Sequence, residues 1–90
     1  MDTLWARGGS MFPFVPSNSL LHVMAPDRDS IRPGDLVCYP AARSVIAHRV
    51  VRVEGGPPER VFVTRGDAVG ADERVPECAV GYVVTRVEHG

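Results

Sequence analysis

The sequence Val-Ile-Ala-His-Arg-Val-Val-Arg-Val at residues 45–53 decides the fold, because it is the clearest β-strand in the chain. Residues branched at Cβ dominate it, and such residues favour strands. Successive side chains of a strand point to opposite faces. We therefore expect Ile46, His48 and Val50 on one face and the odd-numbered residues, Val53 included, on the other.

Short apolar runs separated by Gly/Pro turns lie on both sides of this strand. We expect further strands at residues 20–24, 36–39, 60–64 and 79–87, a polar loop at 65–73 and an extended or loose arm at 1–9. About five short strands without a helical period indicate an all-β fold, a small antiparallel rolled sheet or barrel.

Composition narrows the classes of function. The 90 residues are expected to form a single domain, 1–90, and a net charge of −1 gives no reason to expect nucleic-acid binding. No apolar run is long enough to cross a membrane, and no secretory signal is recognisable. We expect a cytoplasmic protein, peripheral to the membrane at most, with membrane association only through a partner or a missing anchor.

The cysteines give no metal-binding pattern. Cys38 and Cys78 lie far apart without a CxxC motif, so buried free thiols are expected and a single disulfide is the less favoured alternative. A zinc site made of both cysteines and a histidine lacks the usual ligand spacing. We therefore expect no metal and no cofactor.

A candidate nucleophile lies near the N-terminus. Residues 8–13 read Gly-Gly-Ser-Met-Phe-Pro. The two glycines let another chain approach closely, and Pro13 fixes the direction in which the chain leaves. This arrangement suits a serine hydroxyl, that of Ser10, held on a stiff and exposed turn.

Four more short motifs follow in order: Gly34-Asp35, His48-Arg49-Val50, Gly66-Asp67 with Asp72, and Gly81-Tyr82-Val83. Together with Ser10-Met11, the series resembles the signal peptidase I family, in particular its archaeal and endoplasmic-reticulum branch. The resemblance runs from Gly8 to about residue 87. It implies the small antiparallel β-fold that this family shares with LexA-type peptidases.

The resemblance also implies a catalytic set. Ser10 is the expected nucleophile and His48 the general base, since a serine needs a neighbouring base and the chain has no lysine for a Ser/Lys dyad. Asp67 is the favoured carboxylate for orienting His48, and Asp72 is the alternative. His22 and His89 are expected to be structural or incidental, and Asp35 is expected to fix its turn.

The expected hydrogen-bond donors to the oxyanion are fewer than in the family that the sequence resembles. The backbone N–H of Ser10 is the natural first donor. Many relatives carry a serine two positions before the nucleophile, where this chain has Gly8. A second backbone N–H, or the hydroxyl of Ser17 or Ser19, would take its place.

These features predict a serine endopeptidase that cleaves a leader or signal segment from a peptide or protein substrate bound as an extra strand. The resemblance implies small residues just before the cut. The alternative is a catalytically weak module that binds an extended leader peptide and presents it to a partner enzyme. A self-cleaving, repressor-linked LexA type is disfavoured, because lysine and a DNA-binding domain are both missing.

Overall fold

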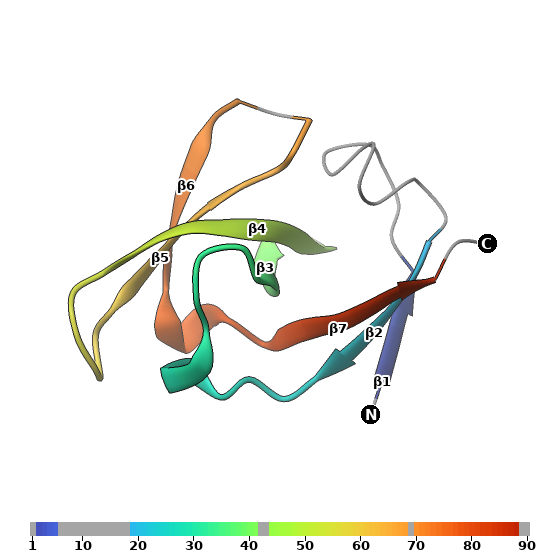
Figure 1. Cartoon of the computed structure of the whole chain (residues 1–90), viewed down its shortest axis with the longest axis horizontal. Helices are drawn as coiled ribbons and strands as arrows, with labels where there is room; N and C mark the ends of the chain where they lie inside the picture. Colours follow the sequence, from blue (N-terminus) through green and yellow to red (C-terminus); the bar gives the residue numbers. More distant parts are fainter. Residues whose placement is uncertain (1, 6–18, 42–43, 69, 89–90) are drawn as a thin grey trace.

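The chain forms one antiparallel sheet in a computed structural model that describes residues 2–5, 19–41, 44–68 and 70–88. In this part of the chain seven strands pair in the order β1-β2-β7-β3-β4-β5-β6 (Figure 1). The strands are β1 (Asp2–Trp5), β2 (Leu20–Met24), β3 (Leu36–Ala41), β4 (Ser44–Glu54), β5 (Val61–Arg65), β6 (Asp72–Pro76) and β7 (Tyr82–Glu88). The predicted all-β antiparallel fold is confirmed. In the described residues the sheet is open, with β1 and β6 at its edges, and does not close into a barrel.

The central strand, β3, packs against two cores, one on each face. The first core consists of the buried residues Ile31, Val37, Tyr39, Val50, Phe62, Val75 and Val80. The second core consists of Leu21, Val23, Leu36 and Cys38. Because β3 contributes alternate residues to both cores, it reads in the sequence as an unbroken apolar run.

The sheet divides where β3 meets β7. These strands pair through Val37↔Val83 and Cys38↔Tyr82, whereas β3 and β4 pair from Leu36↔Arg49 to Ala41↔Ser44. Figure 1 shows β1, β2 and β7 together on one side of this junction and β4, β5 and β6 on the other. A sheet joined by so short a pairing can bend there, which gives each half its own core.

The predicted strand at residues 45–53 is confirmed as β4, but its alternation breaks near the end. The register against β5 shifts between Val50 and Arg52, so one extra residue, Val51, is inserted in β4. Such a β-bulge reverses the faces of the residues that follow it. Val53 consequently packs against the first core with Val50, and the expectation that it lies on the opposite face is wrong.

The sixth strand was not expected from the sequence. A polar loop was predicted over residues 65–73, whereas β6 pairs with β5 from Arg65↔Asp72 to Val61↔Pro76. Val75 is its one buried side chain, and the others are exposed. Charged residues and proline are tolerated on an edge strand, and they leave no alternating apolar signal.

The limits of the other predicted strands differ slightly: β4 is one residue longer at each end, and β5 is shifted by one residue, to Val61–Arg65. β3 continues to Ala41, two residues beyond its predicted end at residue 39. The last strand starts at Tyr82 rather than at residue 79, because a 3-10 helix, η2 (Glu77–Ala79), precedes it. The predicted strand at residues 20–24 matches β2 at both ends.

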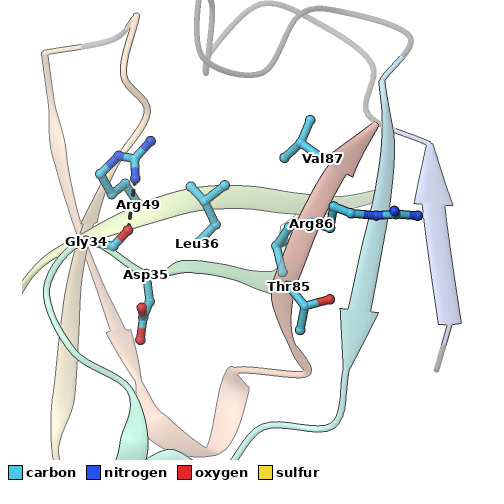
Figure 2. A pocket seen from close by; sticks show the side chains of 8 residues that line it. Gly34, Asp35, Leu36, Arg49, Thr85, Arg86 and Val87 are labelled. Carbon is cyan, nitrogen blue, oxygen red and sulfur yellow. Dashed lines mark hydrogen bonds between the residues drawn. The ribbon is translucent and has the colours of Figure 1, made fainter. Parts of the chain in front are cut away.

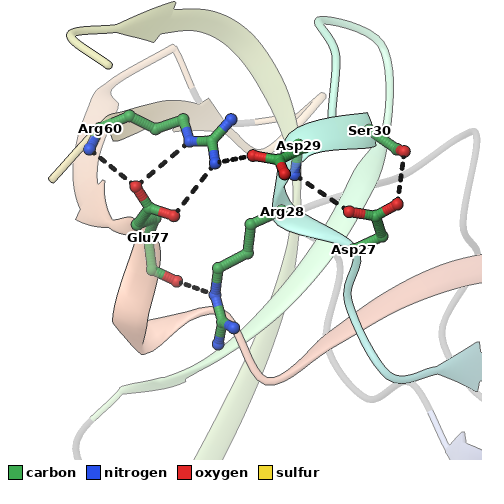
Figure 3. Close-up of polar contacts among 6 residues, drawn as sticks. All are labelled: Asp27, Arg28, Asp29, Ser30, Arg60 and Glu77. Carbon is green, nitrogen blue, oxygen red and sulfur yellow. Dashed lines mark hydrogen bonds and ion pairs between the residues drawn. The ribbon is translucent and has the colours of Figure 1, made fainter. Parts of the chain in front are cut away.

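A polar cluster ties a second 3-10 helix, η1 (Arg28–Ser30), to η2 (Figure 3). The buried carboxylate of Glu77 accepts from the backbone N–H of Arg60 at 2.9 Å and from its Nε at 3.2 Å. Arg60 also donates to Asp29 at 2.6 Å, and Arg28 donates to the carbonyls of Glu77 and Val80 at 2.7 and 3.0 Å. The Arg60 guanidinium lowers the pKa of Glu77. These bonds satisfy buried polar groups beside the first core, so we assign them a structural role.

Candidate active site

His48 is held on β4 by regular strand pairing. It lies opposite Val37 of β3, and paired residues of neighbouring strands share a face, so its side chain lies on the face of the first core. The side chain is half-buried. Its ring stands edge-on to that of Tyr39, with centroids 6.2 Å apart and an interplanar angle of 79°. Backbone pairing, rather than a loop, therefore fixes the position of the imidazole.

The hydroxyl of Tyr39 is the centre of a hydrogen-bond network. It lies 3.2 Å from Nδ1 of His48, 2.9 Å from Oγ1 of Thr64 and 2.6 Å from Oε1 of Glu73. Tyr39 is 4% exposed and Thr64 is fully buried. Four neighbouring strands, β3 to β6, thus supply one side chain each to a network that ends on the histidine.

Burial and charge act on His48 in opposite directions. Desolvation lowers its pKa, while the negative charges of Glu73 and Asp67 raise it, and the net shift is downward from 6.5. The imidazole is therefore neutral at neutral pH, the form that can accept a proton. Burial and the bond to Glu73 raise the pKa of Tyr39, so its hydroxyl stays protonated.

The two predicted aspartates are both paired with arginines. Oδ1 and Oδ2 of Asp67 lie 3.0 and 2.9 Å from Nε and Nη2 of Arg49. Asp72 accepts from Nε of Arg65 at 2.6 Å across the β5–β6 pair. Asp67 still interacts electrostatically with His48, raising the pKa of the histidine. The role of either aspartate in orienting the ring stays a prediction.

Several predicted site residues lie outside the described residues: Ser10, Gly8, Ser17 and His89. Ser19 is described, and its side chain is buried just before β2. The structure therefore leaves the pairing of nucleophile and base as a prediction.

Hydrogen bonds bear on two other predictions. The carboxylate of Asp35 accepts from the backbone N–H of Arg32 at 2.9 Å, which confirms that it fixes its turn. Nε2 of His22 lies 3.2 Å from Oε1 of Glu88 on β7, in a surface contact that fits an incidental role.

Both cysteines are free thiols, as expected. Cys38 is buried in the second core, and burial raises its pKa to about 11. Cys78 is exposed, which corrects the expectation of two buried thiols. It belongs to the short 3-10 helix η2, where the side chain of the neighbouring Glu77 turns inward instead.

A groove of about 480 Å³ lies between the start of β3 and the end of β7. Figure 2 shows it lined by the side chains of Leu36 and Arg49 on one side and of Thr85 and Val87 on the other. Leu36 belongs to the second core and is paired with Arg49. Neighbouring residues of a strand point to opposite faces, so the groove and the imidazole of His48 lie on opposite faces of β4.

Tyr39, Thr64 and Glu73 are the residues of this site that the sequence analysis missed. Tyr39 and Thr64 looked like strand residues, and Glu73 fell in the predicted loop. The opposite charges of Arg65 and Asp72 are the signal that could have revealed them, because they indicate that these two residues pair across neighbouring strands. The next pair in the same register is Thr64↔Glu73.

The fold and the site define a small all-β protein in which a half-buried histidine, His48, is held by the side chain of Tyr39. Among the described residues, no group of three or more His, Cys, Asp or Glu side chains could hold a metal ion. None of the helices in those residues is long and apolar enough to span a membrane. Comparison of the chain with protein-family models, with curated proteins and with solved structures gave no match.

Proposed function

We propose that the protein is a signal peptidase I-like serine endopeptidase that removes a leader segment from a peptide or protein substrate. Ser10 is the nucleophile and His48 the general base. The observation that carries the proposal is the state of His48. Its imidazole is neutral, it is held in place by strand pairing and by the contact with Tyr39, and the negative charges of Glu73 and Asp67 act on it. A general base must be unprotonated at the working pH and stabilised once it gains the proton.

The proposed reaction has two halves. His48 takes the hydroxyl proton of Ser10 while the serine oxygen bonds to the scissile carbonyl carbon. The same proton then goes to the leaving amine as the peptide bond breaks. In the second half, His48 takes a proton from water while the water oxygen bonds to the acyl carbon. The proton then returns to the Ser10 oxygen as the acyl bond breaks, which releases the leader. The charges of Glu73 and Asp67 favour the imidazolium that exists between the steps.

A second candidate function is peptide binding without cleavage, and the groove favours it. The groove has a volume typical of ligand sites and mixes the apolar side chains of Leu36, Val84 and Val87 with the charges of Asp35 and Arg49. It opens on the face of β4 opposite to His48, so a peptide held there would not meet the imidazole directly. Under this reading the protein presents its peptide to a partner enzyme.

One experiment separates the two functions. A library of extended peptides with small residues at fixed positions is incubated with the parent protein and with Ser10→Ala, and cleavage is followed by mass spectrometry. The proposal expects cleavage by the parent and none by Ser10→Ala, with peptide binding retained. Binding without cleavage by the parent would support the presenting module. Cleavage that persists in Ser10→Ala would contradict Ser10 as the nucleophile.

A further inference from the structure

The hydroxyl of Tyr39 makes three contacts, and its chemistry limits how they are shared. A phenol has one proton to donate and two lone pairs that accept. Its three neighbours are a carboxylate oxygen, a threonine hydroxyl and an imidazole nitrogen. One neighbour therefore receives the Tyr39 proton, and the other two must donate to its oxygen.

The distances decide which neighbour receives the proton. Oε1 of Glu73 is the nearest, at 2.6 Å, which is typical of a hydroxyl donating to a carboxylate. A carboxylate cannot donate, so the short contact requires the Tyr39 proton to lie between the two oxygens. Thr64 then donates at 2.9 Å, a shorter contact than its alternative acceptor at 3.5 Å, the carbonyl of Glu73.

The third contact then fixes the histidine. Nδ1 of His48 can approach the Tyr39 oxygen at 3.2 Å only as a donor, which requires hydrogen on Nδ1. In the opposite tautomer, with hydrogen on Nε2, the Tyr39 hydroxyl would have to donate to Nδ1. The Tyr39 oxygen and Oε1 of Glu73 would then lie 2.6 Å apart with no hydrogen between them. In a neutral imidazole with hydrogen on Nδ1, the lone pair lies on Nε2.

We propose that Tyr39 and Glu73 are positioning residues that hold His48 in its Nδ1–H tautomer, with Nε2 as the proton acceptor. The inference rests on the proposed function, and it gives these two residues the task that the sequence analysis assigned to Asp67 or Asp72. In a Ser-His-Asp triad the carboxylate bonds the ring directly. In this chain a buried tyrosine transmits the hydrogen bond between carboxylate and ring.

The titratable and charged groups facing His48 come from the elements around it. They are Tyr39 on β3, Glu73 on β6, and Asp67, whose carboxylate is paired with Arg49 and whose charge acts on His48. When His48 gains a proton, Nδ1 remains a donor to Tyr39, so the network does not have to rearrange during the reaction.

The tautomer is measured directly by 15N NMR of histidine-labelled protein at neutral pH, a readout that needs no activity. We expect His48 to show a protonated Nδ1 and an unprotonated Nε2. In Glu73→Ala the Tyr39 proton loses its carboxylate acceptor and turns to Nδ1 of His48 or to Oγ1 of Thr64, so we expect the Nε2–H form of His48 to gain a measurable population. Glu73→Gln keeps a carbonyl acceptor and should keep the parent tautomer. Glu73 is exposed, so neither change removes core packing.

Tyr39→Phe is the second variant, with Tyr82→Phe as its matched control on the second core. We expect Tyr39→Phe to shift His48 towards Nε2–H and to lower kcat roughly tenfold at unchanged KM, as for the loss of one hydrogen bond. Tyr82→Phe should change neither. An Nε2–H tautomer in the parent, or a tautomer unmoved in Glu73→Ala, would overturn the inference. If the tautomers behave as expected but no peptide is cleaved, the proposed function fails and the positioning network stands.

Discussion

Asp67 and Arg49 form a two-point ion pair, with Oδ1 3.0 Å from Nε and Oδ2 2.9 Å from Nη2. Arg49 directly follows His48 in β4, and its side chain points to the other face of the sheet. The pair lowers the pKa of Asp67, so the carboxylate stays charged beside the histidine. Asp67 therefore acts on His48 through charge, whereas Tyr39 acts on it through a hydrogen bond.

Asp67→Asn should lower the pKa of His48 further, because it removes a negative charge that raises it. The pKa is read from an NMR titration of the His48 ring. Asp72→Asn is the matched control, since Asp72 is paired with Arg65 and does not act on the pKa of His48. A pKa that rises in Asp67→Asn, or that moves equally in both variants, would contradict the assignment.

Activity should rise with pH through one ionisation that lies below 6.5, the ordinary value for a histidine. The sign follows from the mechanism: His48 must be neutral to take the serine proton, and burial lowers its pKa more than Glu73 and Asp67 raise it. The measurement is kcat/KM for a cleaved peptide from acid to neutral pH. A midpoint clearly above 6.5 would mean that another group, or a differently placed His48, controls the reaction.

Glu77→Gln should lower Tm at neutral pH, because Glu77 is buried and bonded to Arg60. The pKa of Glu77 is lowered in the folded state, so its contribution is present above the ordinary value of 4.5 and is lost as pH falls through the folded value. Thermal unfolding of parent and variant should therefore converge in acid. Glu59→Gln, at an exposed position, serves as the control. Equal Tm values at neutral pH would contradict a stabilising role for the cluster.

Phe62→Ala should cost about 3–5 kcal/mol of unfolding free energy, the usual loss for a fully buried phenylalanine. Phe62 lies in the first core with Val50, and it pairs with Val53 of β4, the strand that carries His48. Urea unfolding measures the change, and Val45→Ala, at an exposed site of β4, should stay within about 0.5 kcal/mol of the parent. Similar losses in both variants would show that the first core is not the main source of stability.

The sequence allowed the strands with apolar side chains to be found, because burial imposes a readable pattern. β2 and β4 are examples, the first correct at both ends. Edge strands lack that pattern, which is why β6 was missed. The faces of β4 were correct up to Val50 and wrong at Val53, because a bulge depends on pairing with β5 and leaves no mark in the local composition.

The same limit applies to the candidate site. His48 was found because it stands in a short motif. Glu73 was not, because its contact with Tyr39 joins residues 34 positions apart and exists only once β3, β4, β5 and β6 are aligned. Local sequence records which residues favour a strand, but it does not record which side chains meet across four neighbouring strands.

The most direct test of the central claim is labelling by a serine-directed fluorophosphonate, followed by mass spectrometry of the digested protein. The reagent bonds its phosphorus to an activated serine oxygen and releases fluoride. The account expects a single label on Ser10, lost in Ser10→Ala, strongly slowed in His48→Gln and unchanged in His22→Gln. An unlabelled Ser10, or labelling equally fast with and without His48, would contradict the claim that these residues form a nucleophile and its base.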